Sequence, residues 1–336
     1  MRAWWRRRSR RNKIRLVLYP GILIGTAVSL LWMTRMPGKS HEGPLPALSP
    51  AQVELRDRLR ADVLALGGER NTLTAGTLDK SASFLEQAFK DAGYEPKRLP
   101  YDDDGVKVDN LEATVAGGKE IVIVGAHYDS APGAEGADDN GSGVVSMLAL
   151  ARSFHSAFGG KHPKRTLRFV AFVNEEPPHF WTSKMGSLVY AKECKARGDE
   201  IVAMLSLETL GYFRDEPGTQ KYPPVVSWLY PDRGNFIGFV GNVGSRPLVR
   251  KAIGTFRENA AFPSEGAALP YFVTGVGWSD HWSFYEQGFQ AIMVTDTAPF
   301  RNPNYHTPKD TPDTLDYDRL ARVTSGLEAV VRALID

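Results

Sequence analysis

The stretch of sequence that decides the fold is EIVIVGAHYDS, residues 120–130. Four consecutive β-branched residues, 121–124, predict a short strand of the kind that lies inside a sheet. Gly125 and Ala126 then lead to His127, whose imidazole is a good zinc ligand when it is neutral. This stretch therefore combines a predicted core strand with a candidate metal ligand at its carboxyl end.

Strands and helices alternate on both sides of this stretch. Further strands are predicted at residues 166–173, 201–207, 236–240 and 291–295, and helices at 51–66, 78–92, 144–158 and 315–335. Such alternation favours an α/β fold with a mixed, mainly parallel central sheet sandwiched between helices. We expect one catalytic domain to occupy residues 51–336.

Three of the predicted strands end just before side chains that can bind a metal. These side chains are His127, the adjacent pair Glu175 and Glu176, and Glu208. In a largely parallel sheet the site lies at the carboxyl ends of the strands, so the side chains are expected to converge at one edge.

Two glycine-rich or turn-rich motifs extend the set. Residues 136–143, GADDNGSG, place Asp139 at the start of a predicted helix, where the helix dipole favours a carboxylate. Residues 305–310, YHTPKD, supply a second histidine, His306. Each motif alone is common in turns and on surfaces. Together with the residues at the strand ends, these motifs provide two imidazoles and three carboxylates, which suit a pair of divalent ions. One further carboxylate is left as a base.

In this order the motifs resemble those of the M28 family of zinc aminopeptidases. The matched stretches are 127–130, 136–143, 174–176, 206–211, 279–284 and 305–316, and the resemblance runs from about residue 52 to the C-terminus. It implies the zinc-dependent exopeptidase-like fold, two zinc ions per chain, a peptide substrate, and release of N-terminal amino acids. We expect a bacterial, membrane-anchored member.

The resemblance also implies how the ligands divide. Asp139 would bridge the two ions. His127 and Glu208 would complete one ion's ligands, and Glu176 and His306 the other's. Best-known members carry Asp at the position of Glu208, whose side chain is one methylene longer but still a competent ligand.

Further roles follow from the same resemblance. Glu175 would be the general base, and Tyr305 would donate a hydrogen bond to the oxyanion. Asp129 would orient the imidazole of His127 from behind. A cis peptide bond is expected between Asp139 and the residue after it. Residues expected near a substrate pocket are Phe180, Trp181, Asp280 and His281.

Two other functions stay open at this point. Glutaminyl cyclases of the same superfamily hold one zinc, and residues 175–181 resemble theirs in spacing, including Trp181. They carry a pocket histidine where this chain reads IMV at 292–294. A non-catalytic ectodomain would be expected to lose ligands or the base, whereas every position here is filled. Side-chain preference, and aminopeptidase against carboxypeptidase-like action, are not separated by the sequence.

The N-terminus predicts a membrane anchor. A basic tail, residues 1–15, precedes an uncharged apolar stretch at 16–33, which predicts a transmembrane signal anchor followed by a linker at 34–50. The positive-inside rule leaves the N-terminus in the cytoplasm and the catalytic domain periplasmic or extracellular. A cleaved signal peptide is the alternative.

Charge and cysteine content exclude other classes. The tail holds eight of the 41 basic residues; the remaining 33 face 39 acidic residues, so the rest of the chain carries a net charge of −6. Without a basic stripe or a nucleic-acid motif, no nucleic-acid partner is expected. Cys194, the single cysteine, allows neither an internal disulfide nor a cysteine-based zinc site. The sequence makes no prediction of oligomeric state.

Overall fold

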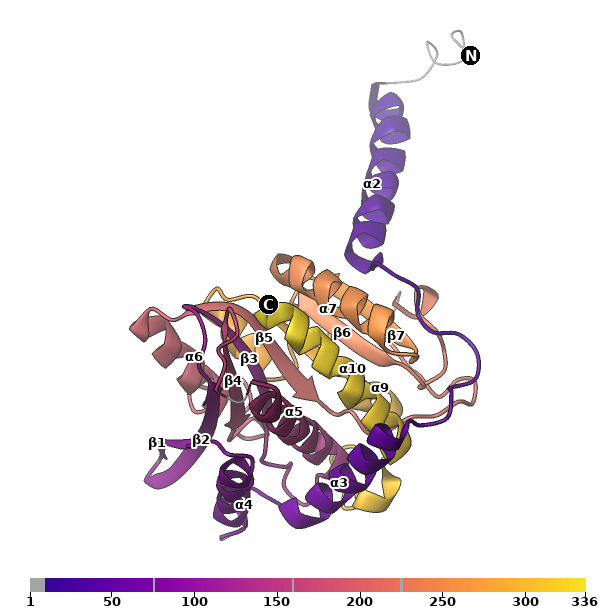
Figure 1. The fold of residues 1–336 in the computed structure, drawn as a ribbon. Helices are drawn as coiled ribbons and strands as arrows, with labels where there is room; N and C mark the ends of the chain where they lie inside the picture. Colours follow the sequence, from indigo (N-terminus) through magenta and orange to yellow (C-terminus); the bar gives the residue numbers. More distant parts are fainter. Residues whose placement is uncertain (1–9, 75, 159, 224–225) are drawn as a thin grey trace. The chain divides into compact units, whose positions relative to one another are not determined.

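The computed structural model describes residues 10–74, 76–158, 160–223 and 226–336. The chain divides into two units, Met1–Arg35 and Met36–Asp336, and each is described by itself. Within the second unit, the described residues form an eight-stranded sheet in the order β1-β2-β4-β3-β5-β8-β6-β7 (Figure 1).

The elements have the following bounds. The strands are β1 (Lys97–Asp103), β2 (Val106–Val115), β3 (Glu120–His127), β4 (Thr166–Phe172), β5 (Glu200–Glu208), β6 (Ile237–Asn242), β7 (Ser264–Leu269) and β8 (Ala291–Thr295). The helices are α2 (Arg10–Thr34), α3 (Pro50–Leu66), α4 (Thr77–Asp91), α5 (Gly143–Phe158), α6 (Gly186–Arg197), α7 (Arg246–Asn259), α8 (His281–Glu286), α9 (Ala298–Arg301) and α10 (Tyr317–Ile335). Short helical turns are η1 (Ala137–Ser142), η2 (Val226–Trp228), η3 (Val243–Ser245) and η4 (Pro312–Thr314).

The centre of the sheet is parallel, and an antiparallel pairing joins an outer pair of strands to each side of it; the outer strands β6 and β7 pair with each other in parallel. Strand β3 pairs in parallel with β4 and with β5, and β5 pairs in parallel with β8. The β1–β2 hairpin joins β4 antiparallel, and β6 joins β8 antiparallel. The predicted mixed, mainly parallel α/β sheet is therefore present. Parallel strands need helical crossovers, which is why helices cover both faces.

The β-branched run in β3 is buried on both faces. Val122 and Val124 belong to the larger apolar cluster, which α3, α4, α5, α7 and α10 complete on one face. Ile121 and Ile123 belong to the smaller cluster on the other face, completed by α6 and α8. Because successive strand residues point to opposite faces, only a run without polar residues satisfies both layers.

The predicted membrane anchor at residues 16–33 is not supported. This stretch lies in helix α2, but no helix among the described residues is long and apolar enough to cross a membrane. At residues 18–34, where side chains are described, Pro20, Gly21 and Thr26 interrupt the apolar residues. A span needs about 20 predominantly apolar residues. The transmembrane helix, the membrane as partner, and the single-pass localisation with a periplasmic or extracellular domain were wrong. Residues 1–9 of the predicted basic tail lie outside the described residues.

Helix α5 begins at Gly143, where its backbone lies close to that of strand β5. A Cβ added at Gly143 would lie 2.4 Å from the Leu207 carbonyl oxygen and 2.3 Å from Asn140 Oδ1. We expect Gly143→Ala to lower the free energy of unfolding by about 1–3 kcal/mol, because backbone of β5 must shift to admit the methyl group. Urea denaturation followed by circular dichroism measures this.

Gly68→Ala is the matched control for this change. A Cβ at Gly68 would meet only Glu135 Cγ, at the ordinary contact distance of 3.8 Å. Equal unfolding free energies for the two variants would contradict the close approach of α5 to β5.

Candidate metal centre and active site

Three neighbouring strands deliver the candidate ligands to one edge of the sheet. His127 is the last residue of β3, Glu208 is the last residue of β5, and Glu175 and Glu176 follow β4. Because β4, β3 and β5 are adjacent and parallel, their carboxyl ends lie together. Asp139 comes from turn η1, which leads into α5.

Asp139 stands between two imidazoles. Its Oδ1 lies 3.4 Å from Nε2 of His127, and its Oδ2 lies 3.0 Å from Nε2 of His306. Each imidazole has a second carboxylate beside it. Glu208 Oε2 is 3.3 Å from Nε2 of His127, and Glu176 Oε2 is 3.1 Å from Nε2 of His306. The five side chains thus form two groups that share one carboxylate.

The donor atoms of this cluster fit a metal. His127 Nε2, both carboxylate oxygens of Asp139 and Glu176 Oε1 are buried and make no hydrogen bond to any described residue. Buried polar atoms almost always have a partner, so this concentration needs an explanation. His127, Asp139 and Glu176 each offer a ligand atom within 4.8 Å of the others. Imidazole nitrogen and carboxylate oxygen are the donors that zinc and similar divalent ions accept.

Burial and like charge perturb the acids of the cluster. Burial raises the pKa of Glu176 to about 8, with Asp139 acting in the same direction, and burial raises the pKa of Glu175 well above its usual value. Burial alone would lower the pKa of His127, but Glu208 and Glu175, with Asp129 and Asp139 acting in the same direction, together raise that pKa. Ionising all of these acids together would place excess negative charge in a dry site, which a divalent cation would relieve.

Asp129 and Asp310 hold the ligand-bearing backbone in place. Asp129 accepts hydrogen bonds from the backbone N–H groups of Glu175 and Glu176, at 3.1 and 3.0 Å. Its backbone carbonyl oxygen lies 3.2 Å from Nδ1 of His127, within hydrogen-bond distance, and its Oδ1 lies 3.5 Å from the same nitrogen. Asp310 accepts from the backbone N–H groups of Asp138 and Asp139, both at 3.0 Å. Each carboxylate clamps one ligand-bearing turn.

A buried arginine completes this support. Arg70 donates to the carbonyl oxygens of Tyr128 and Gly136, both at 2.8 Å, and so joins the ends of the loop that follows His127. Its charge also lies within electrostatic reach of Asp129, Asp310 and Asp139. Sequence reasoning missed Arg70, because it binds backbone and stands in no motif. Asp310 lies inside the YHTPKD motif, which was the available signal.

Glu208 is held by a serine from a distant segment. Ser279 Oγ donates to Glu208 Oε2 at 2.6 Å, and Ser206 lies 2.8 Å from Ser279. Asn140 donates from Nδ2 to the carbonyl oxygen of Leu207 at 2.7 Å, which ties the end of β5 to turn η1. The longer glutamate therefore has a defined place facing His127. The peptide bond Asp139–Asn140 is cis, as the family resemblance predicts.

Two segments that carry candidate ligands contain a residue with left-handed backbone. Asn174, just before Glu175, has φ 59°, and His306 has φ 56°. Non-glycine residues adopt this region rarely, and such positions concentrate at functional sites. The ring of Tyr305 stacks on that of His306 with centroids 3.9 Å apart, so the candidate oxyanion donor lies against a candidate ligand.

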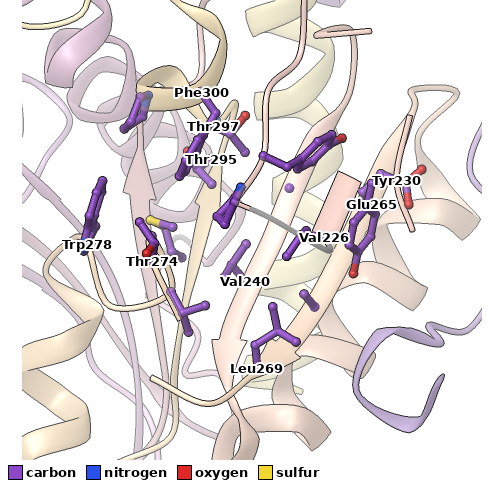
Figure 2. Close-up of a pocket in the computed structure, with 18 of the residues that line it drawn as sticks. Val226, Tyr230, Val240, Glu265, Leu269, Thr274, Trp278, Thr295, Thr297 and Phe300 are labelled. Carbon is purple, nitrogen blue, oxygen red and sulfur yellow. The ribbon is translucent and has the colours of Figure 1, made fainter. Parts of the chain in front are cut away.

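An apolar cavity opens beside the cluster (Figure 2). Glu208 and Tyr305 line its near end, and most of its wall comes from β6, β7, β8 and the loops around them. Phe180, Trp181, Asp280 and His281, which the sequence predicts near a substrate pocket, are not among the residues that line this cavity. Asp280 and His281 are fully buried, and Phe180 stacks on the half-exposed Trp181, which in turn contacts Trp282.

Comparison with known proteins assigns the chain to a protein family. The model of peptidase family M28 matches residues 110–331. The chain belongs to peptidase family M28. An uncharacterised protein, YfbL of Escherichia coli (strain K12), is 34% identical over 306 residues, 88% of this chain and 90% of that protein. A probable leucine aminopeptidase of Arthroderma otae is 27% identical over 70% of this chain and 59% of its own length.

Solved structures of several proteins are similar to this chain in fold. The LapA aminopeptidase of Legionella pneumophila superposes with a TM-score of 0.67 at 18% identity, over 88% of this chain and 77% of that one. The glutaminyl cyclase of Tannerella forsythia superposes with a TM-score of 0.60 at 19% identity, over 85% of this chain and 99% of that one. At these identities the likeness concerns the fold.

The clamp made by Asp129 is testable apart from catalysis. We expect Asp129→Asn to weaken zinc binding about 10- to 100-fold, because an amide nitrogen replaces one of the two acceptors for Glu175 and Glu176 N–H. Competition with a chromogenic chelator measures the affinity. Asp109→Asn removes a carboxylate that pairs with Arg98, away from the cluster, and should leave zinc affinity unchanged. Equal affinities for both variants would show that Asp129 does not support the ligands.

Proposed function

We propose that this M28 peptidase is a two-zinc aminopeptidase, with Glu175 as general base. The observation that carries the proposal is the shared carboxylate of Asp139, which faces His127 on one side and His306 on the other. His127, Asp139 and Glu208 would hold one ion, and Asp139, Glu176 and His306 the other. When bound, such ions lower the pKa of water and polarise a carbonyl group.

Glu175 is the acid left over after the ligands are assigned. Its Oε2 lies 3.8 Å from Nε2 of His127, farther than either Asp139 or Glu208. Burial raises the pKa of its carboxyl well above the usual value, which brings the group closer to the range in which a side chain both accepts and returns a proton. Glu175 would take a proton from the attacking water and deliver it to the leaving amine.

Tyr305 would donate a hydrogen bond to the carbonyl oxygen of the substrate. It lines the near end of the cavity beside Glu208, and stacking on His306 fixes its ring. Burial raises the pKa of its hydroxyl, so the group stays protonated and able to donate. A donor aimed at a developing oxyanion contributes about 3–4 kcal/mol to lowering a reaction barrier.

Glutaminyl cyclisation is the second candidate. The likeness in fold to a solved cyclase and the position of Trp181, five residues after Glu176, favour it. Against it, β8 carries Ile292, Met293 and Val294 where cyclases carry a pocket histidine, and two ligand groups rather than one surround Asp139. Incubation with glutaminyl peptides separates the two reactions, since cyclisation releases ammonia and no amino acid.

Neighbouring glutamates should respond differently to the same substitution. We expect Glu175→Gln to retain zinc and to lower kcat by about 10²–10⁴ with little change in KM, because only the proton carrier is lost. Glu176→Gln should lose zinc affinity and regain part of its activity in excess zinc, because a ligand is lost. Mass spectrometry of the native protein gives zinc content, and hydrolysis of aminoacyl-p-nitroanilides gives the rates.

The pair of variants is its own control, since both make the same change one residue apart. Loss of zinc from Glu175→Gln, with retention by Glu176→Gln, would reverse the two roles. Full activity in both would contradict the proposed hydrolase mechanism.

A further inference from the structure

The cavity beside the metal cluster ends in an acidic side chain. A row of paired residues crosses four strands: Glu208 pairs with Thr295, Thr295 with Gly238, and Gly238 with Glu265. All four line the cavity. With strands about 4.8 Å apart, Glu265 lies about 14 Å from Glu208 between Cα atoms. The candidate ligand and the distal acid therefore stand at opposite ends of one cavity.

The middle of this row is open because Gly238 has no side chain. A Cβ there would lie 3.2 Å from the Thr295 carbonyl oxygen and 3.6 Å from Thr297 Cγ2, so any side chain would narrow the passage. The cavity volume is about 110 Å³. A cavity of about 150 Å³ admits a benzene ring, so this cavity has room for roughly one side chain.

Aromatic rings wall the cavity. Tyr222 and Tyr230 stack with centroids 6.0 Å apart, and Trp278 and Phe300 stack at 6.2 Å. All four rings line the cavity, and Trp278, Phe300, Tyr230 and Glu265 are labelled in Figure 2. Aromatic faces attract cations as well as apolar groups. The walls alone thus suit either an apolar side chain or the methylene stem of a cationic one.

The surroundings of Glu265 favour a cationic over an apolar side chain in the cavity. The side chain of Glu265 is 24% exposed, and the structure gives its carboxylate no hydrogen bond from a described residue. The nearest described cation is Arg257, whose Nη2 lies 4.0 Å from Oε2. That guanidinium already donates to Ser264 Oγ, to the Ser264 carbonyl oxygen and to the Pro37 carbonyl oxygen, at 3.0, 2.6 and 3.0 Å. Glu265 therefore keeps acceptor capacity on the cavity side.

An apolar occupant would exclude water from this carboxylate without giving it a hydrogen-bond donor, which is costly. A guanidinium or ammonium group at the end of a long stem would pair it within the aromatic walls. We propose that the cavity receives the side chain of the substrate's N-terminal residue and that Glu265 selects arginine or lysine there. This inference rests on the proposed aminopeptidase function and names its substrate class.

Lysine and norleucine substrates test the proposal most cleanly, because the two side chains differ only in the terminal ammonium group. With the full chain loaded with zinc, we expect kcat/KM for arginyl- and lysyl-p-nitroanilide to exceed that for the norleucyl compound at least about tenfold. Glu265→Gln should lower kcat/KM for the cationic substrates about 10- to 100-fold and leave the norleucyl value unchanged or higher.

Glu120→Gln is the matched control, because Glu120 is another strand glutamate beside an arginine, Arg165, and lies outside the cavity. It should leave all three values unchanged. Two results would overturn the proposal. One is a wild type whose kcat/KM is higher for the norleucyl than for the lysyl substrate. The other is a Glu265→Gln substitution that lowers kcat/KM equally for all three substrates.

Binding without turnover separates this inference from the proposed function. Calorimetry with arginine amide and norleucine amide as probes needs no hydrolysis. Tighter binding of arginine amide to the wild type than to Glu265→Gln, with no such difference for norleucine amide, supports the cationic cavity even if every p-nitroanilide is left intact. Equal binding of the two amides to the wild type overturns it, whatever the hydrolysis assay shows.

Discussion

Mutual repulsion among buried carboxylates is the constraint on which the rest of the structure depends. Asp139, Glu175, Glu176 and Glu208 lie at one dry edge of the sheet, where unpaired charge is costly. His127 and His306 lie between the acids, the buried Arg70 adds a positive charge nearby, and several buried donor atoms of the cluster remain available to bind a cation. Backbone N–H groups held by Asp129 and Asp310 keep those acids from moving apart.

The two halves of the sheet carry different parts of the site. The candidate ligands and the candidate base lie at or just after the ends of strands β4, β3 and β5. The parallel register of these strands therefore fixes the distances between those side chains. Strands β8, β6 and β7 line the cavity, and one row of paired residues runs across them from the candidate ligand Glu208 to Glu265. Changes in the cavity half can therefore alter which side chain is accepted while the ligand half keeps its geometry.

Some of this organisation follows from the sequence and some does not. The run at 121–124 predicts a core strand because only apolar residues satisfy two covered faces, and convergence of His127, Glu176 and Glu208 follows from parallel strand ends. Strand β7, SEGAAL, was missed because it lacks β-branched residues, and with it the place of Glu265. Arg70 bonds mainly to backbone carbonyls, which no motif encodes. The apolar residues at 16–33 suggested a membrane span that the described helix does not support.

The most direct test of the shared carboxylate is anomalous diffraction at the zinc edge, from crystals of this chain grown with zinc. The account predicts two peaks about 3.5–4 Å apart, one on each side of the Asp139 carboxylate. One should lie within bonding distance of His127 and Glu208, and the other within bonding distance of Glu176 and His306. A single peak, or peaks that leave Asp139 bound to one ion or none, would contradict it.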